Sequence, residues 1–125
     1  LKVERNIEQP ENGVTLHLSD RSAHFDRVVF ACHADQALAI GRVLVHERLA
    51  ACINVLPGMT SIYRWQGVVE EAREAVLIAK TRADRITALT ERVRSLHTYR
   101  LPCVVALTID GGDADYLDWL ARESG

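Results

Sequence analysis

Two strand-like segments separated by a short link constrain the fold of this chain most. Leu49–Val55 is an apolar run, and Ser61–Gly67 is a second run that is rich in aromatic side chains. The link contains Pro57-Gly58, a dipeptide typical of turns. Because a parallel crossover needs about a dozen residues or more, so short a link favours a hairpin. The sequence therefore predicts strands over residues 51–55 and 62–69, joined by a turn at Pro57-Gly58, with Gly67 as a bulge or turn point in the second strand.

The spacing of apolar residues indicates the remaining elements. It predicts a first helix that is capped by Asp35 and runs to about Leu49, and a second helix that ends near Leu96. A third, short helix is expected after Asp113, whose carboxylate is a good N-cap. Further strands are predicted at residues 14–18, 28–32, 75–79 and 103–109. The run 75–79 is apolar on both faces, which places it in the centre of a sheet.

This order of elements predicts an α+β fold. Helices on one face of a mostly antiparallel sheet make a sandwich, and the order fits a ferredoxin-like βαββαβ unit with an extended hairpin and a C-terminal helix. An alternating α/β fold with a parallel sheet is the alternative, and the short hairpin link weakens it. We expect residues 1–26 to be an N-terminal extension, either an extra strand or disordered, and residues 27–125 to form the ferredoxin-like domain.

Composition excludes several classes of function. The 125 residues carry a formal net charge of -2 and no basic block, so neither nucleic acid nor an anionic membrane is an expected partner. The three cysteines are sparse and lack a short CxxC spacing, which argues against a disulfide scaffold and favours a reducing cytoplasm. No catalytic arrangement of side chains stands out, so we do not expect an enzyme.

The aromatic run predicts an interface between subunits. In a strand, Tyr63 and Trp65 fall on one face while Ile62 and Arg64 fall on the other. A long strand that is partly apolar on both faces is hard to bury inside a small monomer, and sheet edges attract partner chains. A core strand within one chain is the alternative, and the residues alone support it equally.

Five segments together resemble the divalent-cation tolerance (CutA) family. Leu49–Val55 and Ser61–Gly67 resemble its signature, and three later segments agree in the same order. These later segments are Leu77–Thr81, His97–Pro102 and Asp115–Leu120. The resemblance covers roughly residues 41–122. It implies a ferredoxin-like fold, a homotrimer in which long strands pair between subunits, and a role in tolerance of divalent metal ions, chiefly copper.

The same resemblance implies a metal site of cysteine and histidine side chains, which bind copper well. It points to Cys32, Cys52 and His97 as ligands. Cys103 joins them because a thiol stands where the family usually has a glutamate, and Thr98 stands in place of a usual proline. The alternatives are a helix-end cation for His97 and simple core packing for Cys52.

The N-terminal third carries a second resemblance. Residues 13–40 are similar to a segment of flavin-dependent amine-oxidase-like proteins, in which a strand leads toward the nucleotide. The Gly-x-Gly-x-x-Gly phosphate loop is absent, so no flavin is expected. Either the strand and helix coincide through shared physics, or this part of the chain is a fusion or recombined segment.

These observations favour a cytoplasmic homotrimer that binds a divalent metal ion, copper foremost, and performs no catalysis. One alternative is a small-molecule sensor comparable to the PII signalling proteins, with its ligand between subunits near Lys80 and Trp65. Another is a structural trimer that binds metal incidentally. Fold alone cannot separate these alternatives.

Overall fold

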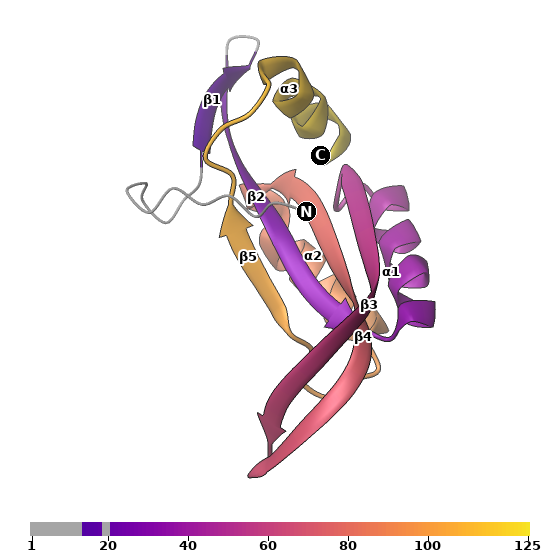
Figure 1. The fold of residues 1–125 in the computed structure, drawn as a ribbon. Helices are drawn as coiled ribbons and strands as arrows, with labels where there is room; N and C mark the ends of the chain where they lie inside the picture. Colours follow the sequence, from indigo (N-terminus) through magenta and orange to yellow (C-terminus); the bar gives the residue numbers. More distant parts are fainter. Residues whose placement is uncertain (1–13, 19–20) are drawn as a thin grey trace.

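The computed structural model describes residues 14–18 and 21–125 of the chain. Figure 1 shows a twisted sheet with α1 and α2 beside one face, α3 at one end, and a long hairpin that extends past the other end. In chain order the elements are β1 (Val14–Leu18), β2 (Arg21–Cys32), α1 (Ala34–His46), β3 (Cys52–Trp65), β4 (Val68–Arg82), a short 3-10 turn (Ala83–Arg85), α2 (Ile86–Leu96), β5 (Val104–Thr108) and α3 (Ala114–Glu123).

The strand order confirms the ferredoxin-like fold. In the described part of the chain every neighbouring pair of strands is antiparallel. Residues 26–30 of β2 pair with both β4 and β5, so these two strands lie on opposite sides of β2. The order β5–β2–β4–β3 follows, and β1 extends the sheet beside the first half of β2. The predicted central place of the run 75–79 is confirmed, because β4 lies between β2 and β3.

The predicted turn at Pro57-Gly58 is wrong. β3 runs unbroken from Cys52 to Trp65, and Pro57-Gly58 forms a bulge where the pairing register with β4 shifts between Leu56 and Met59. Proline is tolerated there because β3 is an edge strand of the described sheet and a bulge does not need its missing N–H. The hairpin therefore contains one long pair of strands, and its segment beyond the bulge, residues 59–74, is called the arm below.

The turn lies at Gln66-Gly67, which confirms Gly67 as a turn point, although it divides the strand predicted over residues 62–69 between β3 and β4. Gln66 has φ 50° and Gly67 has φ 83°. Positive φ at both central residues is what a type I′ turn requires, and its twist matches that of the two strands. The residues predicted as one strand therefore belong to the ends of β3 and β4.

The predicted N-cap is confirmed for α3 and wrong for α1. Asp113 caps α3 as expected, because its Oδ2 accepts a hydrogen bond of 2.9 Å from the backbone N–H of Tyr116. Asp35 does not cap α1; His33 holds the N-cap position, and Asp35 lies in the first turn of the helix. Since β2 continues to Cys32, the helix begins directly after the strand and leaves no room for a later cap.

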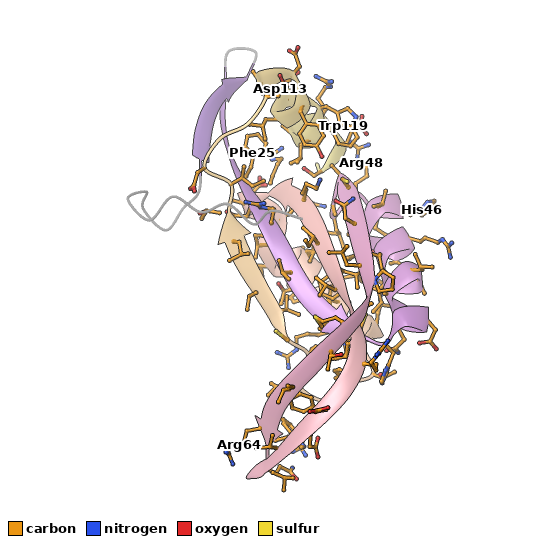
Figure 2. All side chains as sticks on the ribbon, viewed as in Figure 1. Phe25, His46, Arg48, Arg64, Asp113 and Trp119 are labelled. Atoms are coloured by element: carbon orange, nitrogen blue, oxygen red, sulfur yellow. The ribbon has the colours of Figure 1, made fainter. Side chains whose placement is uncertain are left out.

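The core has two parts. The larger part lies between one face of the sheet and helices α1 and α2, with Phe30, Leu44, Leu77 and Leu89 among its fully buried side chains. The smaller part lies under α3 and includes Phe25. Figure 2 shows Phe25 and Trp119 at the α3 end of the molecule and Arg64 at the far end of the arm. On the opposite face of the sheet, α3 covers one end, where it packs on Phe25 of β2 and contacts Lys80 of β4. Along the rest of β2 and β4, no helix of the described residues covers that face (Figure 1).

The turn at the tip of the arm gives a direct test of this hairpin. Gly67→Ala should lower the free energy of unfolding by about 1 kcal/mol, because alanine resists positive φ. No atom lies within 4 Å of a Cβ placed at Gly67, so a steric clash would not contribute. Gln66→Gly should raise stability by a similar amount. Urea unfolding measures both, and equal stability of the two variants would contradict the turn at Gln66-Gly67.

Candidate functional site

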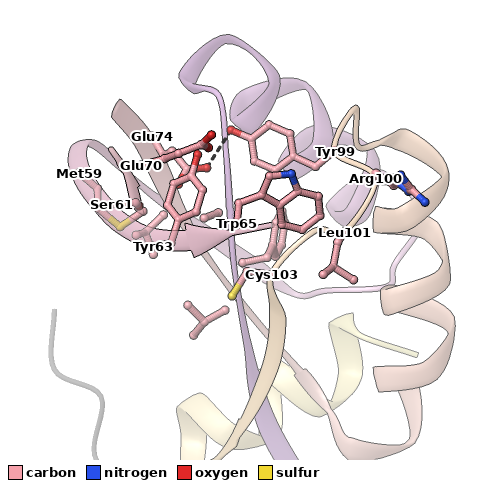
Figure 3. A pocket seen from close by; sticks show the side chains of 14 residues that line it. Met59, Ser61, Tyr63, Trp65, Glu70, Glu74, Tyr99, Arg100, Leu101 and Cys103 are labelled. Carbon is pink, nitrogen blue, oxygen red and sulfur yellow. Dashed lines mark hydrogen bonds between the residues drawn. The ribbon is translucent and has the colours of Figure 1, made fainter. Parts of the chain in front are cut away.

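The sheet face that points away from α1 and α2, called the open face below, carries a cavity of about 600 Å³. Side chains alternate along β4, so Ala75 and Leu77 face the helices while Glu74 and Val76 face the other way. Glu74 and Val76 both line the cavity. The walls come from β2, from the arm, and from the segment that joins α2 to β5 (Figure 3).

The arm supplies aromatic and acidic side chains to this cavity. Tyr63 and Trp65 line it from β3, which confirms that they share one face of their strand. Tyr63 pairs across the ladder with Glu70, and Met59 pairs with Glu74. The cavity therefore has an aromatic wall next to two carboxylates (Figure 3).

Glu74 is the most buried acidic residue in the described part of the chain. Its residue is 8% exposed, and its Oε2 accepts a hydrogen bond of 2.8 Å from the hydroxyl of Tyr99. Burial raises the pKa of Tyr99 to about 12, with Glu74 adding to the effect through its hydrogen bond and its charge. The phenol therefore stays neutral and remains a donor to Glu74.

The ring of His97, at the start of the segment between α2 and β5, is held in place by two hydrogen bonds. Its Nδ1 accepts a hydrogen bond of 3.0 Å from the backbone N–H of Tyr99, and its Nε2 lies 2.8 Å from the carbonyl oxygen of Ala31. Since Nδ1 accepts, Nε2 must carry the proton and donate it to that carbonyl. Both ring nitrogens are thus engaged, and the residue is 8% exposed. Its ring also packs on Tyr99, with centroids 4.6 Å apart.

The three cysteines lie in three different environments. Cys32 is fully buried, and burial, followed by the charges of Glu74 and Asp35, raises the pKa of its thiol to about 11. Cys52 is half-buried, with its Sγ 3.8 Å from Oδ1 of Asn54. Cys103 is exposed and lines the cavity. Cys103 is therefore the thiol most open to a ligand.

The four predicted metal ligands do not meet at one point in the chain. Cys52 pairs with Lys80 and Cys32 pairs with Ala75, which are five residues apart on β4. That spacing is roughly 17 Å along an extended strand, and the odd number puts the two thiols on opposite faces. Within residues 14–18 and 21–125, no group of three or more His, Cys, Asp or Glu side chains is placed to hold a metal ion. The ligand set therefore stays a prediction.

The structure also separates Lys80 from Trp65 within one chain, whereas the ligand site predicted near these residues lies between subunits. Trp65 pairs with Val68, twelve residues from Lys80 along β4, or roughly 40 Å in an extended strand. Lys80 instead contacts Tyr116 of α3, with its Nζ 3.3 Å from the hydroxyl oxygen. The two residues do not share a site within one chain.

Glu74 and Tyr99 were not singled out from the sequence. Glu74 stands at the end of a run of charged residues that resembles a solvated hairpin. The signal that could have identified it is its spacing, since Glu74 lies two residues before Val76 and four before Ile78 and therefore shares their face of the strand. Tyr99 gives no comparable signal, because its contact with Glu74 depends on the fold.

The strand order, the open face and the long hairpin define a ferredoxin-like α+β protein with an extended arm. The family model described as CutA1 divalent ion tolerance protein matches residues 27–123, and the chain belongs to this family. The family resemblance is thus confirmed and reaches further toward the N-terminus than residue 41. The match includes residues 27–40, and nothing supports the resemblance of residues 13–40 to flavin-dependent proteins.

Known relatives agree with this assignment. The divalent-cation tolerance protein CutA of Thermus thermophilus is 52% identical over 71% of this chain and 86% of its own length. The CutA homolog of Xenopus laevis is 49% identical, and the chain spans 54% of that longer relative. Among solved structures, the Thermus thermophilus Cut A1 protein has a TM-score of 0.79 at 46% identity and is covered to 99%, with 81% of this chain covered.

One further comparison bears on function. The solved structure described as PII-like protein CutA from Nostoc has a TM-score of 0.76 at 30% identity, covering 80% of this chain and 97% of that one. In the described part of the chain, no helix is long and apolar enough to cross a membrane.

The pair of Tyr99 and Glu74 gives a testable pH dependence. Because the fold favours the neutral phenol, its stabilising effect is complete below the ordinary tyrosine pKa of about 10 and is lost as the pH rises toward 12. Glu74→Gln should lower the pKa of Tyr99, since it removes the charge but leaves the burial. A phenolate absorbance titration measures this, with Tyr99→Phe to assign the last tyrosine to ionise. If that tyrosine ionises equally late in Glu74→Gln, the contact is absent.

Proposed function

We propose that this chain assembles as a homotrimer that functions in divalent-cation tolerance, copper foremost, by binding the metal ion rather than by catalysis. The family assignment supports the role in tolerance. The exposed arm is the observation that supports assembly into an oligomer. Trimer stoichiometry follows from the resemblance to the family.

The arm is built like a surface that another chain covers. Ile62 is 68% exposed and Val69 is 59% exposed on one face of the arm, while Val68 and Tyr63 are exposed on the other. Contiguous apolar surface of this kind marks interaction sites in soluble proteins. In the described residues β3 also pairs with β4 alone, so its outer edge offers unpaired backbone groups to a second chain.

Among the four predicted ligands, Cys103 is the one most ready to bind a soft metal ion. Its thiol is exposed, and thiolates are preferred ligands of copper(I). Cys52, which is half-buried, comes second. Copper at His97 would have to replace one of its two hydrogen bonds, and copper at Cys32 would have to reach a fully buried thiol. We therefore expect Cys103 to be the main copper ligand among the four predicted residues.

A cytoplasmic location belongs to the same proposal. All three cysteines are free in the structure, as is usual for proteins of a reducing compartment. The relative from Archaeoglobus fulgidus, at 29% identity, is described as periplasmic, so fractionation of cells that express this protein is the relevant test.

A sensor of small molecules is the second candidate function. The cavity on the open face supports it, because a volume of about 600 Å³ lies in the range of sites for small ligands. A solved relative described as PII-like points in the same direction. Uptake of copper separates these two candidates from each other, and a structural trimer that binds metal incidentally stays the third alternative.

Native mass spectrometry of the reduced protein, with and without an equivalent of copper(I), tests the proposal. We expect a trimer that takes up copper stoichiometrically. Cys103→Ser should lower the uptake and leave the trimer mass unchanged, whereas Cys32→Ala, the matched control, should have little effect on uptake. A trimer that ignores copper would favour the sensor, and a monomer would contradict the assembly.

A further inference from the structure

We propose that the bulge at Pro57-Gly58 sets the direction of the arm, so that the arm fits a second copy of this chain. The proposal rests on the assembly proposed above and names the feature of the chain that makes the assembly specific. It is based on the geometry of the bulge, on the position of the arm outside both parts of the core, and on the backbone conformation of Gly58.

The bulge inserts one extra residue into β3. Between Leu56 and Met59, β3 advances by three residues, whereas β4 advances by two, from Val76 to Glu74. One extra residue in one strand of an antiparallel pair bends that strand and increases its twist. Figure 1 shows that the hairpin changes direction where the arm leaves the rest of the sheet. The direction of the arm therefore depends on this one residue.

The bulge also reverses the faces of the strand. Val55 pairs with Leu77 on the side of the helices, whereas Tyr63 pairs with Glu70 and lines the cavity on the open face. Odd-numbered residues of β3 thus point toward the helix side before the bulge and toward the open face after it. Ile62 consequently points to the other face of the arm. The bulge therefore decides which apolar side chains of the arm a second copy would meet on each face.

Packing within one chain does not account for the bend. All residues of the arm lie in the described part of the chain, and none of them belongs to either part of the core. β3 joins the larger part only through Ile53 and Val55, which precede the bulge. The hydrogen bond from Tyr99 to Glu74 lies at the base of the arm. Beyond its base the arm adds little to the core of its own chain, so its direction acts on contacts with another copy.

The length of the arm makes its direction important. Residues 59–65 of β3 span roughly 20 Å, so a rotation of about 15° at the bulge moves the tip by about 5 Å, which is the spacing between paired strands. The exposed apolar side chains of Ile62 and Val69 and the outer edge of β3 all lie in the arm. A change of angle at its base would therefore disturb strand pairing and apolar burial against a second copy together.

The backbone of Gly58 allows the bulge to be tested without a steric clash. Gly58 has φ 79°, and no atom lies within 4 Å of a Cβ placed on it. Glycine adopts positive φ freely and asparagine tolerates it, whereas a β-branched residue strongly disfavours it. Substitutions at this position therefore change the conformational preference of the bulge and remove no contact of a side chain.

The first test compares Gly58→Asn with Gly58→Val. Exchange of subunits between isotope-labelled and unlabelled copies, followed by native mass spectrometry, measures how firmly the assembly holds. Gly58→Asn, the matched control, should exchange subunits at the rate of the unaltered protein. Gly58→Val should exchange them at least about tenfold faster, because valine disfavours the positive φ that the bent strand requires.

The second test removes the bulge by deleting Pro57 in combination with Gly58→Thr. All other pairs between β3 and β4 can be kept, because the one residue left between Leu56 and Met59 stands opposite Ala75. We expect the chain to fold, as checked by circular dichroism and by hydrogen exchange of β2, since the core contains no residue of the arm. The straightened arm should leave a monomer, or an assembly that exchanges subunits at least about tenfold faster.

The possible outcomes separate this proposal from the assembly itself. A folded deletion variant that exchanges subunits as slowly as the unaltered protein would overturn the role of the bulge and leave the proposed assembly standing. If the deletion variant does not fold, the two substitutions at Gly58 decide, and equal exchange rates for them would overturn the proposal. An unaltered protein that is monomeric by native mass would contradict the assembly and this proposal with it.

Discussion

The continuous pairing of β3 with β4 is the constraint on which the rest of the structure depends. It runs from Cys52 opposite Lys80 to Trp65 opposite Val68 and crosses a bulge without ending. Because side chains alternate along a strand, this register decides which residues face the helices and which face the open side. A slip of β4 by one residue would turn Glu74 into the apolar core and move the aromatic wall away from its carboxylates.

Helices α1 and α2 cover one face of the sheet and α3 covers only one end of the other, so the rest of the open face has to be completed by something else. It combines two properties that are unfavourable in an isolated chain, namely exposed apolar side chains on the arm and a buried carboxylate at Glu74. A second copy would remove the apolar surface from water. The proposed assembly therefore accounts for the exposed apolar side chains of the arm.

Elements whose determinants lie close together in the chain can be predicted from sequence. Asp113 caps α3 through a backbone N–H three residues on, and the apolar run of β4 indicates its central place. Pro57-Gly58 is a local turn signal that the long-range pairing of β3 with β4 overrides. In the candidate functional site, the free thiol of Cys103 could be predicted from the sequence. The contact between Glu74 and Tyr99 joins residues 25 apart and exists only once the sheet has formed.

Amide hydrogen exchange of the arm tests whether a second copy covers this hairpin. In β3, every other N–H points away from β4 and has no partner in the described sheet. At concentrations where the protein is assembled, we expect these outward amides of residues 59–65 to exchange as slowly as the amides of β4 outside the arm. Exchange as fast as that of a solvated hairpin would mean that no second copy covers the arm.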